Sequence, residues 1–145
     1  MKSSTYRILN EQFDEFPNMR AKSVPSESEI VKASRKIGIP FDPDYEEFLR
    51  RYGAGFAGAY PIYGLRPVEL MGDDFWSVVA VTSEFRSQGV PGTDRWIVFS
   101  DDQACNPVGM DKDGKVWIHD HDFGGIALLE NSFEDYLRNW CLDVE

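Results

Sequence analysis

The spacing of the hydrophobic residues changes near residue 96 of this 145-residue chain. Before that point apolar residues recur every three or four positions, as in helices, and after it they alternate, as in strands. A helical pattern returns close to the C-terminus. Helices, then a run of strands, then a closing helix predict an α+β fold, with N-terminal helices, a central antiparallel or mixed sheet and a C-terminal helix.

Three helices are predicted in the first third of the chain. The apolar face of the first consists of Tyr6, Leu9, Phe13 and Phe16. After a loop over residues 17–25, the second helix begins at the Ser-Glu-Ser-Glu capping box of residues 26–29 and ends at Gly38, which suits a left-handed C-cap. The third begins at Asp42 and Pro43, a capping carboxylate followed by a proline at the first helical position.

The middle of the chain predicts a short strand near residues 60–63 and a helix over residues 73–89. Asp73 and Asp74 suit the N-terminus of that helix, and Phe75 falls in its apolar stripe.

Strands are predicted over residues 96–100, 107–110 and 115–120, and an apolar run follows at 126–129. Asp113-Gly114 predicts a two-residue type I′ turn, which needs positive φ at both positions. Asn131 or Ser132 caps the last helix, whose predicted stripe is Phe133, Tyr136, Leu137, Trp140 and Cys141.

The composition fits one domain over residues 1–145. Hydrophobic residues make up 42%, charged residues 28% and aromatic residues 14%, which supports one sizeable core. No apolar run reaches the roughly 18–20 residues that cross a bilayer, and residues 1–10 lack the apolar core of a signal peptide. The two cysteines, Cys105 and Cys141, cannot form a disulfide framework, so a cytoplasmic protein with free thiols is predicted.

The negative charge is concentrated in the last third of the chain. The net charge is −10, and residues 101–145 contain 3 basic and 11 acidic residues, a net charge of −8. This distribution disfavours nucleic acids and acidic membranes as partners and allows a basic protein partner. Solubility alone is the competing explanation.

The most chemically suggestive string is His119-Asp120-His121-Asp122, which holds both histidines of the sequence. Two histidines at i and i+2 of a strand lie about 7 Å apart on one face and can share a metal. The dinuclear-zinc pattern H-x-H-x-D-H requires Asp and His where Phe123 and Gly124 stand. We therefore predict no cofactor and interpret these residues as polar groups at a strand end. A metal-dependent hydrolase using His119 and His121 remains the weaker alternative.

The order of several short motifs resembles the SUKH superfamily, which includes the fungal Smi/Knr-type cell-wall regulators and many bacterial immunity proteins. Residues 37–55 resemble its "lg..lP.dy..fl...nGg" signature, and residues 102–122 resemble "dG.Gnpi..d..G.v...dhd". Ser132 to Leu137 is similar to the closing "sFeeyL". The resemblance covers residues 26–140 and leaves an N-terminal helix and loop at 1–25. One departure is Ala104-Cys105 in place of a family glycine, which predicts a changed loop.

The resemblance implies a single non-catalytic SUKH-like domain that binds a protein. The bacterial members imply an immunity protein that neutralises a basic toxin domain such as a nuclease, and the fungal members imply a regulator of cell-wall glucan synthesis. The predicted partner-binding residues are Asp101, Asp102, Asp120 and Asp122, with Trp117 as an aromatic anchor. Trp117 alternates with Val116 and Ile118, so one of these two sets faces away from the core. The oligomeric state is not predicted.

Overall fold

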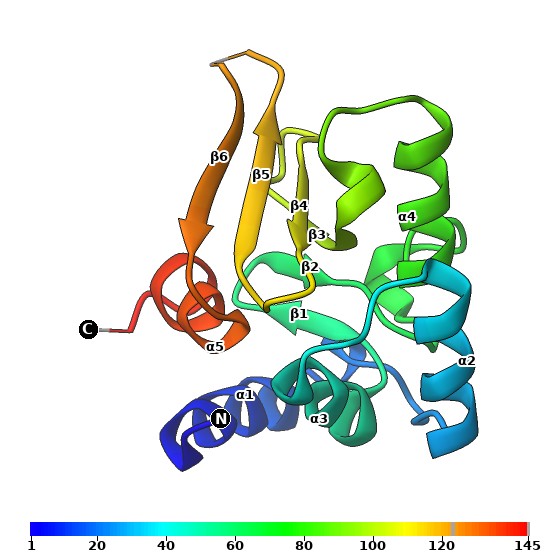
Figure 1. Ribbon diagram of the computed structural model, residues 1–145. Helices are drawn as coiled ribbons and strands as arrows, with labels where there is room; N and C mark the ends of the chain where they lie inside the picture. The colour runs from blue at the N-terminus through cyan, green and yellow to red at the C-terminus, as the bar shows by residue number, and fades with distance from the viewer. Residues whose placement is uncertain (123, 145) are drawn as a thin grey trace.

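The computed structural model describes residues 1–122 and 124–144, and within them it is an α+β fold, as predicted (Figure 1). Its α-helices are α1 (Ser3–Glu15), α2 (Glu27–Ile37), α3 (Pro43–Tyr52), α4 (Val78–Ser87) and α5 (Phe133–Tyr136). Its strands are β1 (Gly55–Ala57), β2 (Tyr60–Ile62), β3 (Ile97–Asp101), β4 (Pro107–Met110), β5 (Val116–Asp120) and β6 (Gly125–Glu130). Short 3₁₀ turns lie at η1 (Pro17–Met19), η2 (Glu69–Met71) and η3 (Thr93–Arg95), and a π-helical turn, η4 (Leu137–Cys141), follows α5.

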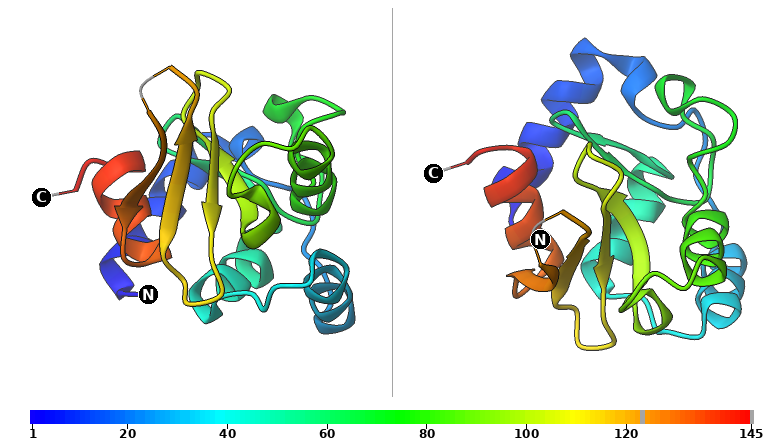
Figure 2. Two further views of the ribbon diagram at one scale, coloured as in Figure 1. Left: turned by 45° about the horizontal axis from the view of Figure 1, so that its top comes forward. Right: turned by 90° about the horizontal axis from the view of Figure 1, so that it is seen from above.

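The sheet is a meander in which the strands follow one another in chain order. Its spatial order is β1-β2-β3-β4-β5-β6, and every neighbouring pair is antiparallel. Of the two predicted alternatives, the antiparallel sheet is therefore confirmed. No α-helix crosses in front of β5 and β6 in the left view of Figure 2, whereas the helices gather behind and beside the sheet. One face of these strands is therefore left open.

The helix ends form for the reasons that the sequence suggests. Ser26 and Glu29 form the full capping box, each side chain accepting a hydrogen bond from the other residue's backbone N–H. Gly38 ends α2 with a φ of 86°, in the left-handed region that favours glycine. The Asp42 carboxylate accepts hydrogen bonds from the N–H groups of Asp44 and Tyr45, at 3.0 and 3.3 Å.

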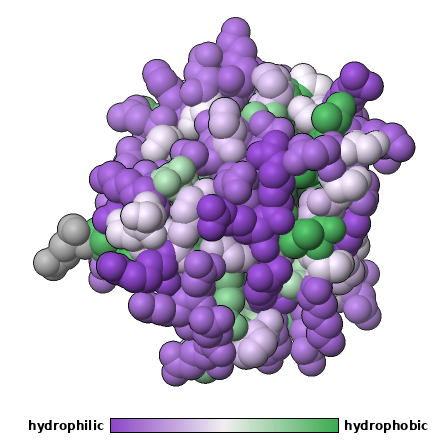
Figure 3. Space-filling view, turned by 90° about the horizontal axis from the view of Figure 1, so that it is seen from below, coloured by the Kyte–Doolittle hydropathy of each residue, from purple (hydrophilic) through white to green (hydrophobic). Residues whose placement is uncertain are grey.

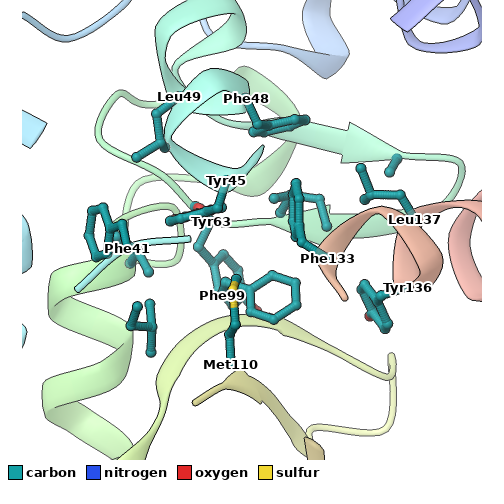
Figure 4. Close-up of a cluster of buried hydrophobic side chains, with 14 of the residues drawn as sticks. Phe41, Tyr45, Phe48, Leu49, Tyr63, Phe99, Met110, Phe133, Tyr136 and Leu137 are labelled. Carbon is teal, nitrogen blue, oxygen red and sulfur yellow. The ribbon is translucent and has the colours of Figure 1, made fainter. Parts of the chain in front are cut away.

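Aromatic side chains from α3, β3 and α5 form the centre of the core (Figure 4). The Phe133 ring lies 5.5 Å from the rings of both Tyr45 and Phe99, and 5.9 Å from that of Phe48, in edge-to-face geometry. The hydroxyl of Tyr45 donates to the Tyr63 carbonyl at 2.6 Å. The core therefore joins the first half of the chain to its C-terminal helix.

Two of the predicted helical stripes are too long, and each error has a local cause. α1 ends at Glu15, because Pro17 disfavours a helical conformation at Phe16, which has φ −127° and is 48% exposed. α4 begins after Ser77, whose hydroxyl accepts from the Ala80 N–H, so the N-terminus predicted at Asp73 and Asp74 is wrong. Phe75 precedes the helix and is 46% exposed.

The last helix also departs from its predicted stripe. Ser132 caps α5, as predicted, and Phe133, Tyr136, Leu137 and Cys141 are buried. After Tyr136 the chain passes into the wider π-helical turn η4, which places Trp140 outside the buried set, at 47% exposed. The indole N–H of Trp140 donates to the Glu130 carboxylate at 3.2 Å.

The β4–β5 hairpin is one residue longer than predicted. Gly114 has positive φ (82°) but Asp113 does not, so the type I′ prediction is wrong. The Gly114 N–H donates to the Asp111 carbonyl, and the Asp111 N–H to the Lys115 carbonyl, which defines a three-residue loop ending in a glycine bulge. The Asp111 carboxylate favours this longer loop because it accepts from the N–H groups of Asp113 and Lys115, at 2.8 and 3.0 Å.

The loop between β3 and β4 contains two strained residues. Gln103 and Cys105 have φ values of 71° and 65°, a region unfavourable for residues with a Cβ. Cys105 is one of the two residues, Ala104 and Cys105, that stand in place of a glycine in the resemblance described above. The Asp102 carboxylate holds the loop by accepting from the N–H groups of Ala104 and Asn106 and from the Asn106 side-chain amide.

We expect Gln103→Gly and Cys105→Gly each to raise the free energy of unfolding by about 0.5–1 kcal/mol, because glycine adopts positive φ without steric strain. Urea denaturation monitored by tryptophan fluorescence measures the change. Ala104→Gly is the matched control: Ala104 has no positive φ, so there the extra backbone freedom is expected to lower stability. Equal effects at all three positions would contradict the assignment of strain.

The two ends of the chain are tied to each other. The Glu134 carboxylate accepts from the Lys2 N–H and from the Thr5 hydroxyl. The Arg138 guanidinium donates to the hydroxyls of Ser4 and Thr5, at 3.1 and 2.9 Å. The first helix is therefore held in place by the last one.

Candidate protein-binding surface

Four of the predicted partner-binding residues lie at one end of the sheet. Asp101 ends β3, Asp102 follows it, Asp120 ends β5, and Asp122 lies in the next turn. Because β3 and β5 are both antiparallel to β4, which lies between them, their C-terminal ends lie at the same end of the sheet. The N–H of His121 donates to the Asn106 side-chain oxygen at 3.3 Å, joining the two loops. We call Asp101, Asp102, Asp120 and Asp122 the acidic end.

Hydrogen bonds hold three of the four carboxylates of the acidic end, those of Asp101, Asp102 and Asp120. Asp101 accepts from the Tyr63 hydroxyl at 2.6 Å and from the Gln103 N–H at 2.7 Å. Burial opposes ionisation of Asp102, but its hydrogen bonds outweigh that effect and its pKa lies below the ordinary value. Asp120 accepts from the Asp122 N–H at 2.9 Å, and the Asp122 side chain is 63% exposed. These groups therefore present negative charge in a defined arrangement.

Trp117 does not belong to the acidic end. In β5, Val116 and Ile118 are buried in the core and Trp117 lies on the opposite, outer face, which resolves the alternation left open by the sequence. It lines a groove of about 520 Å³ together with Ile126 and the segments 38–40, 94–96 and 111–113. We call this the tryptophan groove.

Close packing over a glycine defines one wall of the tryptophan groove. Gly109 faces Trp117 across the β4–β5 pair, and a Cβ added at Gly109 would lie 2.5 Å from the Trp96 side chain. Trp96 therefore lies directly on the backbone of β4 and is only 3% exposed. The Trp117 indole N–H donates to the Asp111 carboxylate at 2.9 Å, which fixes the second ring.

Arg86 of α4 holds two of the segments that line the tryptophan groove. Its guanidinium donates to the Ile37 carbonyl at 2.7 Å, to the Thr93 carbonyl at 2.9 Å and to the Trp96 carbonyl at 3.1 Å. Burial lowers the pKa of Arg86, which nevertheless stays charged at neutral pH. One side chain thus helps to position two segments that line the groove, residues 38–40 and 94–96.

The described residues do not support the metal-site alternative. Within residues 1–122 and 124–144, no three His, Cys, Asp or Glu side chains are placed to hold a metal ion. His119 lies on β5 opposite Ile126, but the strand ends at Asp120, so His121 belongs to the following turn. Strand alternation therefore does not bring the two histidines to a shared face. Cys141 is buried, which raises the pKa of its thiol to about 12.

One further face of the molecule is compared with these surfaces. The end of the molecule built from α1, α2 and α3 is mostly hydrophilic, with small separated apolar areas (Figure 3). Across the described part of the chain, no helix has the length and apolar character required to span a bilayer.

The sequence did not reveal most of the tryptophan groove. Its lining comes from the loop directly after α2, from η3 and from the β4–β5 hairpin. These segments lie far apart in the chain. One signal was present: Gly109 stands inside a strand, and a glycine there often marks close approach by another group. That signal does not identify Trp96 as the group that approaches, nor Arg86 as the residue that holds it.

The chain was compared with known proteins and protein families. No curated protein matches it. The family model SUKH_5, described as SMI1-KNR4 cell-wall, matches residues 7–142. This match includes most of α1, all six strands and α5, and so extends beyond the resemblance over residues 26–140. The chain, with its antiparallel sheet and its grooved outer face, therefore belongs to the SMI1-KNR4 family of SUKH domains.

Proposed function

We propose that this chain is a non-catalytic, single-domain immunity protein that binds and neutralises a basic toxin domain, such as a nuclease. The observation that carries the proposal is the acidic end, where four aspartates lie at the same end of the sheet. The carboxylates of Asp101, Asp102 and Asp120 accept internal hydrogen bonds. A nuclease presents Lys and Arg to its substrate, so a fixed acidic surface can compete for the same groups.

Preorganisation strengthens this interpretation. Binding normally orders flexible side chains, at about 0.5–1.5 kcal/mol for each one that is immobilised. Asp101 and Asp102 are already held by Tyr63 and by the loop backbone, so they lose little freedom when a partner binds. Complementary charge chiefly accelerates association, and salt screens this effect.

The tryptophan groove supplies an apolar contact beside the charged one. Buried aromatic and arginine side chains contribute most of the energy at typical interfaces, and they do so in pockets with fixed walls. Trp117 is half-buried and held by Asp111, and Ile126 is 39% exposed. We propose that an apolar side chain of the partner enters the groove next to Trp117.

Co-expression with candidate toxins encoded by neighbouring genes tests the proposal. We expect restored growth and a stable complex with a dissociation constant that rises with salt. Trp117→Ala is expected to weaken the complex by at least about 30-fold, and Asp122→Asn by a few-fold, mainly through slower association. Asp14→Asn is the matched control, because Asp14 is exposed on α1 and belongs neither to the acidic end nor to the lining of the tryptophan groove.

The same experiment separates immunity from regulation, the alternative favoured by the family's description as SMI1-KNR4 cell-wall. No rescue and no complex with any candidate toxin would overturn the immunity proposal. Co-purification with enzymes of cell-wall synthesis, lost in Trp117→Ala, would instead assign the surface to a regulatory domain.

A further inference from the structure

β6 forms an open edge of the sheet. It is the last strand in the order, and its one strand neighbour is β5. Its middle residues are exposed, with Ile126 at 39% and Leu128 at 46%, and α5 lies near one end of the strand only (Figure 1). In the left view of Figure 2 the helical segment that includes α5 lies beside the lower part of β6, and no helix lies beside its upper part.

The hydrogen-bond pattern of the hairpin shows which backbone groups of β6 face outward. The Asp111 N–H bonds to the Lys115 carbonyl, so Lys115 directs its backbone groups toward β4. Along an antiparallel strand this direction alternates, so Ile118 directs its groups toward β6. Ile118 pairs with Ala127, which therefore directs its groups back toward β5. The N–H and C=O groups of Ile126 and Leu128 consequently point to the open edge.

An independent observation confirms this pattern. Gly109 pairs with Trp117, which the same alternation makes a hydrogen-bonded pair, so Gly109 cannot bond to Val98 on its other side. The backbone N–H of Val98 instead bonds to the Thr82 hydroxyl at 3.0 Å, as this arrangement requires. Outside the sheet, none of the hydrogen bonds among the described residues uses the backbone of Ile126 or Leu128.

β6 has one of the usual protections of an edge strand, a bulge between Leu128 and Glu130, but its centre lacks the protective side chains. Exposed edges normally carry proline, lysine or an inward-pointing charge that blocks further pairing, whereas Ile126 to Leu129 are all apolar. Carboxylates flank this apolar centre: Asp120 and Asp122 lie before it, and Glu130 ends the strand. A second copy of this chain would place like charges close together, because each copy has a net charge of −10.

We infer that β6 accepts an added strand from the protein partner, an extended segment with apolar residues at its centre and Lys or Arg at its ends. Main-chain hydrogen bonds to Ile126 and Leu128 would provide affinity, and the side chains of those two residues, together with the flanking carboxylates, would provide selectivity. This inference rests on the proposed function for the partner's basic character. It adds the mode of recognition.

A synthetic peptide tests the edge without any toxin. We expect the peptide Lys-Lys-Thr-Val-Thr-Ile-Thr-Lys-Lys to slow amide hydrogen exchange at Ile126 and Leu128 by about tenfold or more, measured by NMR. Exchange at Ala127, which already bonds to β5, is expected to change much less. The same peptide with Glu in place of every Lys is expected to bind at least about tenfold more weakly.

Two variants at one position separate backbone from side chain. Leu128→Pro removes an N–H that faces the edge and leaves the ladder to β5 intact, so peptide affinity is expected to fall by about tenfold or more. Leu128→Thr removes apolar surface but keeps the N–H, and its affinity is expected to stay within about threefold. Thermal unfolding of both variants verifies that each is folded.

Several outcomes would overturn the inference. The first is that amide exchange at Ile126 and Leu128 stays unchanged at the highest peptide concentration. The second is that folded Leu128→Pro binds the peptide as tightly as the wild type. The third is that these two amides become protected when the chain self-associates without peptide. The proposed function fails separately: peptide pairing at β6 without toxin rescue would overturn immunity but not the added strand. Full rescue by Leu128→Pro would overturn the added strand but not immunity.

Discussion

Replacing Phe133 with alanine is expected to lower the free energy of unfolding by about 3–5 kcal/mol. The side chain is fully buried, and its ring meets those of Tyr45, Phe48 and Phe99, which come from α3 and β3. The cavity left behind would lie where the helices, the sheet and the C-terminal helix meet. Because a domain of this size is typically stable by only about 5–15 kcal/mol, the variant would lose a large fraction of its stability.

Chemical denaturation followed by circular dichroism measures this change. Phe133→Leu keeps most of the buried volume and is expected to lose less than about 1.5–2 kcal/mol. Phe16→Ala is the exposed control and is expected to change stability by no more than about 0.5 kcal/mol, because that ring lies beyond the end of α1. A loss below about 1.5 kcal/mol for Phe133→Ala would show that the ring is not the centre of the core.

Arg86→Met is expected to lower the free energy of unfolding by about 3 kcal/mol, although Arg86 lies outside the aromatic core. The substitution keeps much of the apolar stem but removes the guanidinium from the carbonyls of Ile37, Thr93 and Trp96. Of these, the Thr93 carbonyl keeps a longer bond, 3.4 Å, from the Trp96 N–H. All three of those residues are buried, so water cannot fully replace the guanidinium. Because the same bonds hold the walls of the tryptophan groove, partner binding should weaken even where the variant stays folded.

Arg86→Lys separates charge from geometry. Lysine keeps the positive charge but cannot reach three carbonyls with the fixed fork of a guanidinium, so it is expected to recover less than half of the loss. Arg35→Met on the exposed side of α2 is the matched control and is expected to have little effect. Wild-type stability and unchanged tryptophan fluorescence in Arg86→Met would contradict the assigned role.

Local signals in the sequence predict most of the helix and strand boundaries. The Ser26 capping box, Gly38 and Asp42-Pro43 act through neighbours within four residues, so the sequence contains the whole interaction. The alternation around Trp117 likewise predicts that one set of β5 side chains leaves the core. Where the helical stripes were too long, a nearby residue interrupts the helix: Pro17 ends α1, and the Ser77 cap delays α4.

The rest depends on contacts that periodicity does not contain. The choice between a two-residue and a three-residue hairpin is decided by the Asp111 carboxylate, which bonds two backbone N–H groups in the loop. The acidic end could be predicted as a set of residues, but its separation from Trp117 could not, because that depends on which strand ends and which faces the sheet brings together. The tryptophan groove needed the position of Arg86 relative to three other segments.

The contacts between the first and last helices affect when this chain can finish folding in a cell. Thr5 bonds to Glu134 and Arg138, so α1 leaves the ribosome long before the residues that hold it have been synthesised. At about 5–20 residues per second, the delay is roughly 6–26 s. During that interval Thr5, which is buried in the finished domain, lacks both of these partners. A chain that terminates before residue 134 would therefore lack the contacts that hold α1 in place.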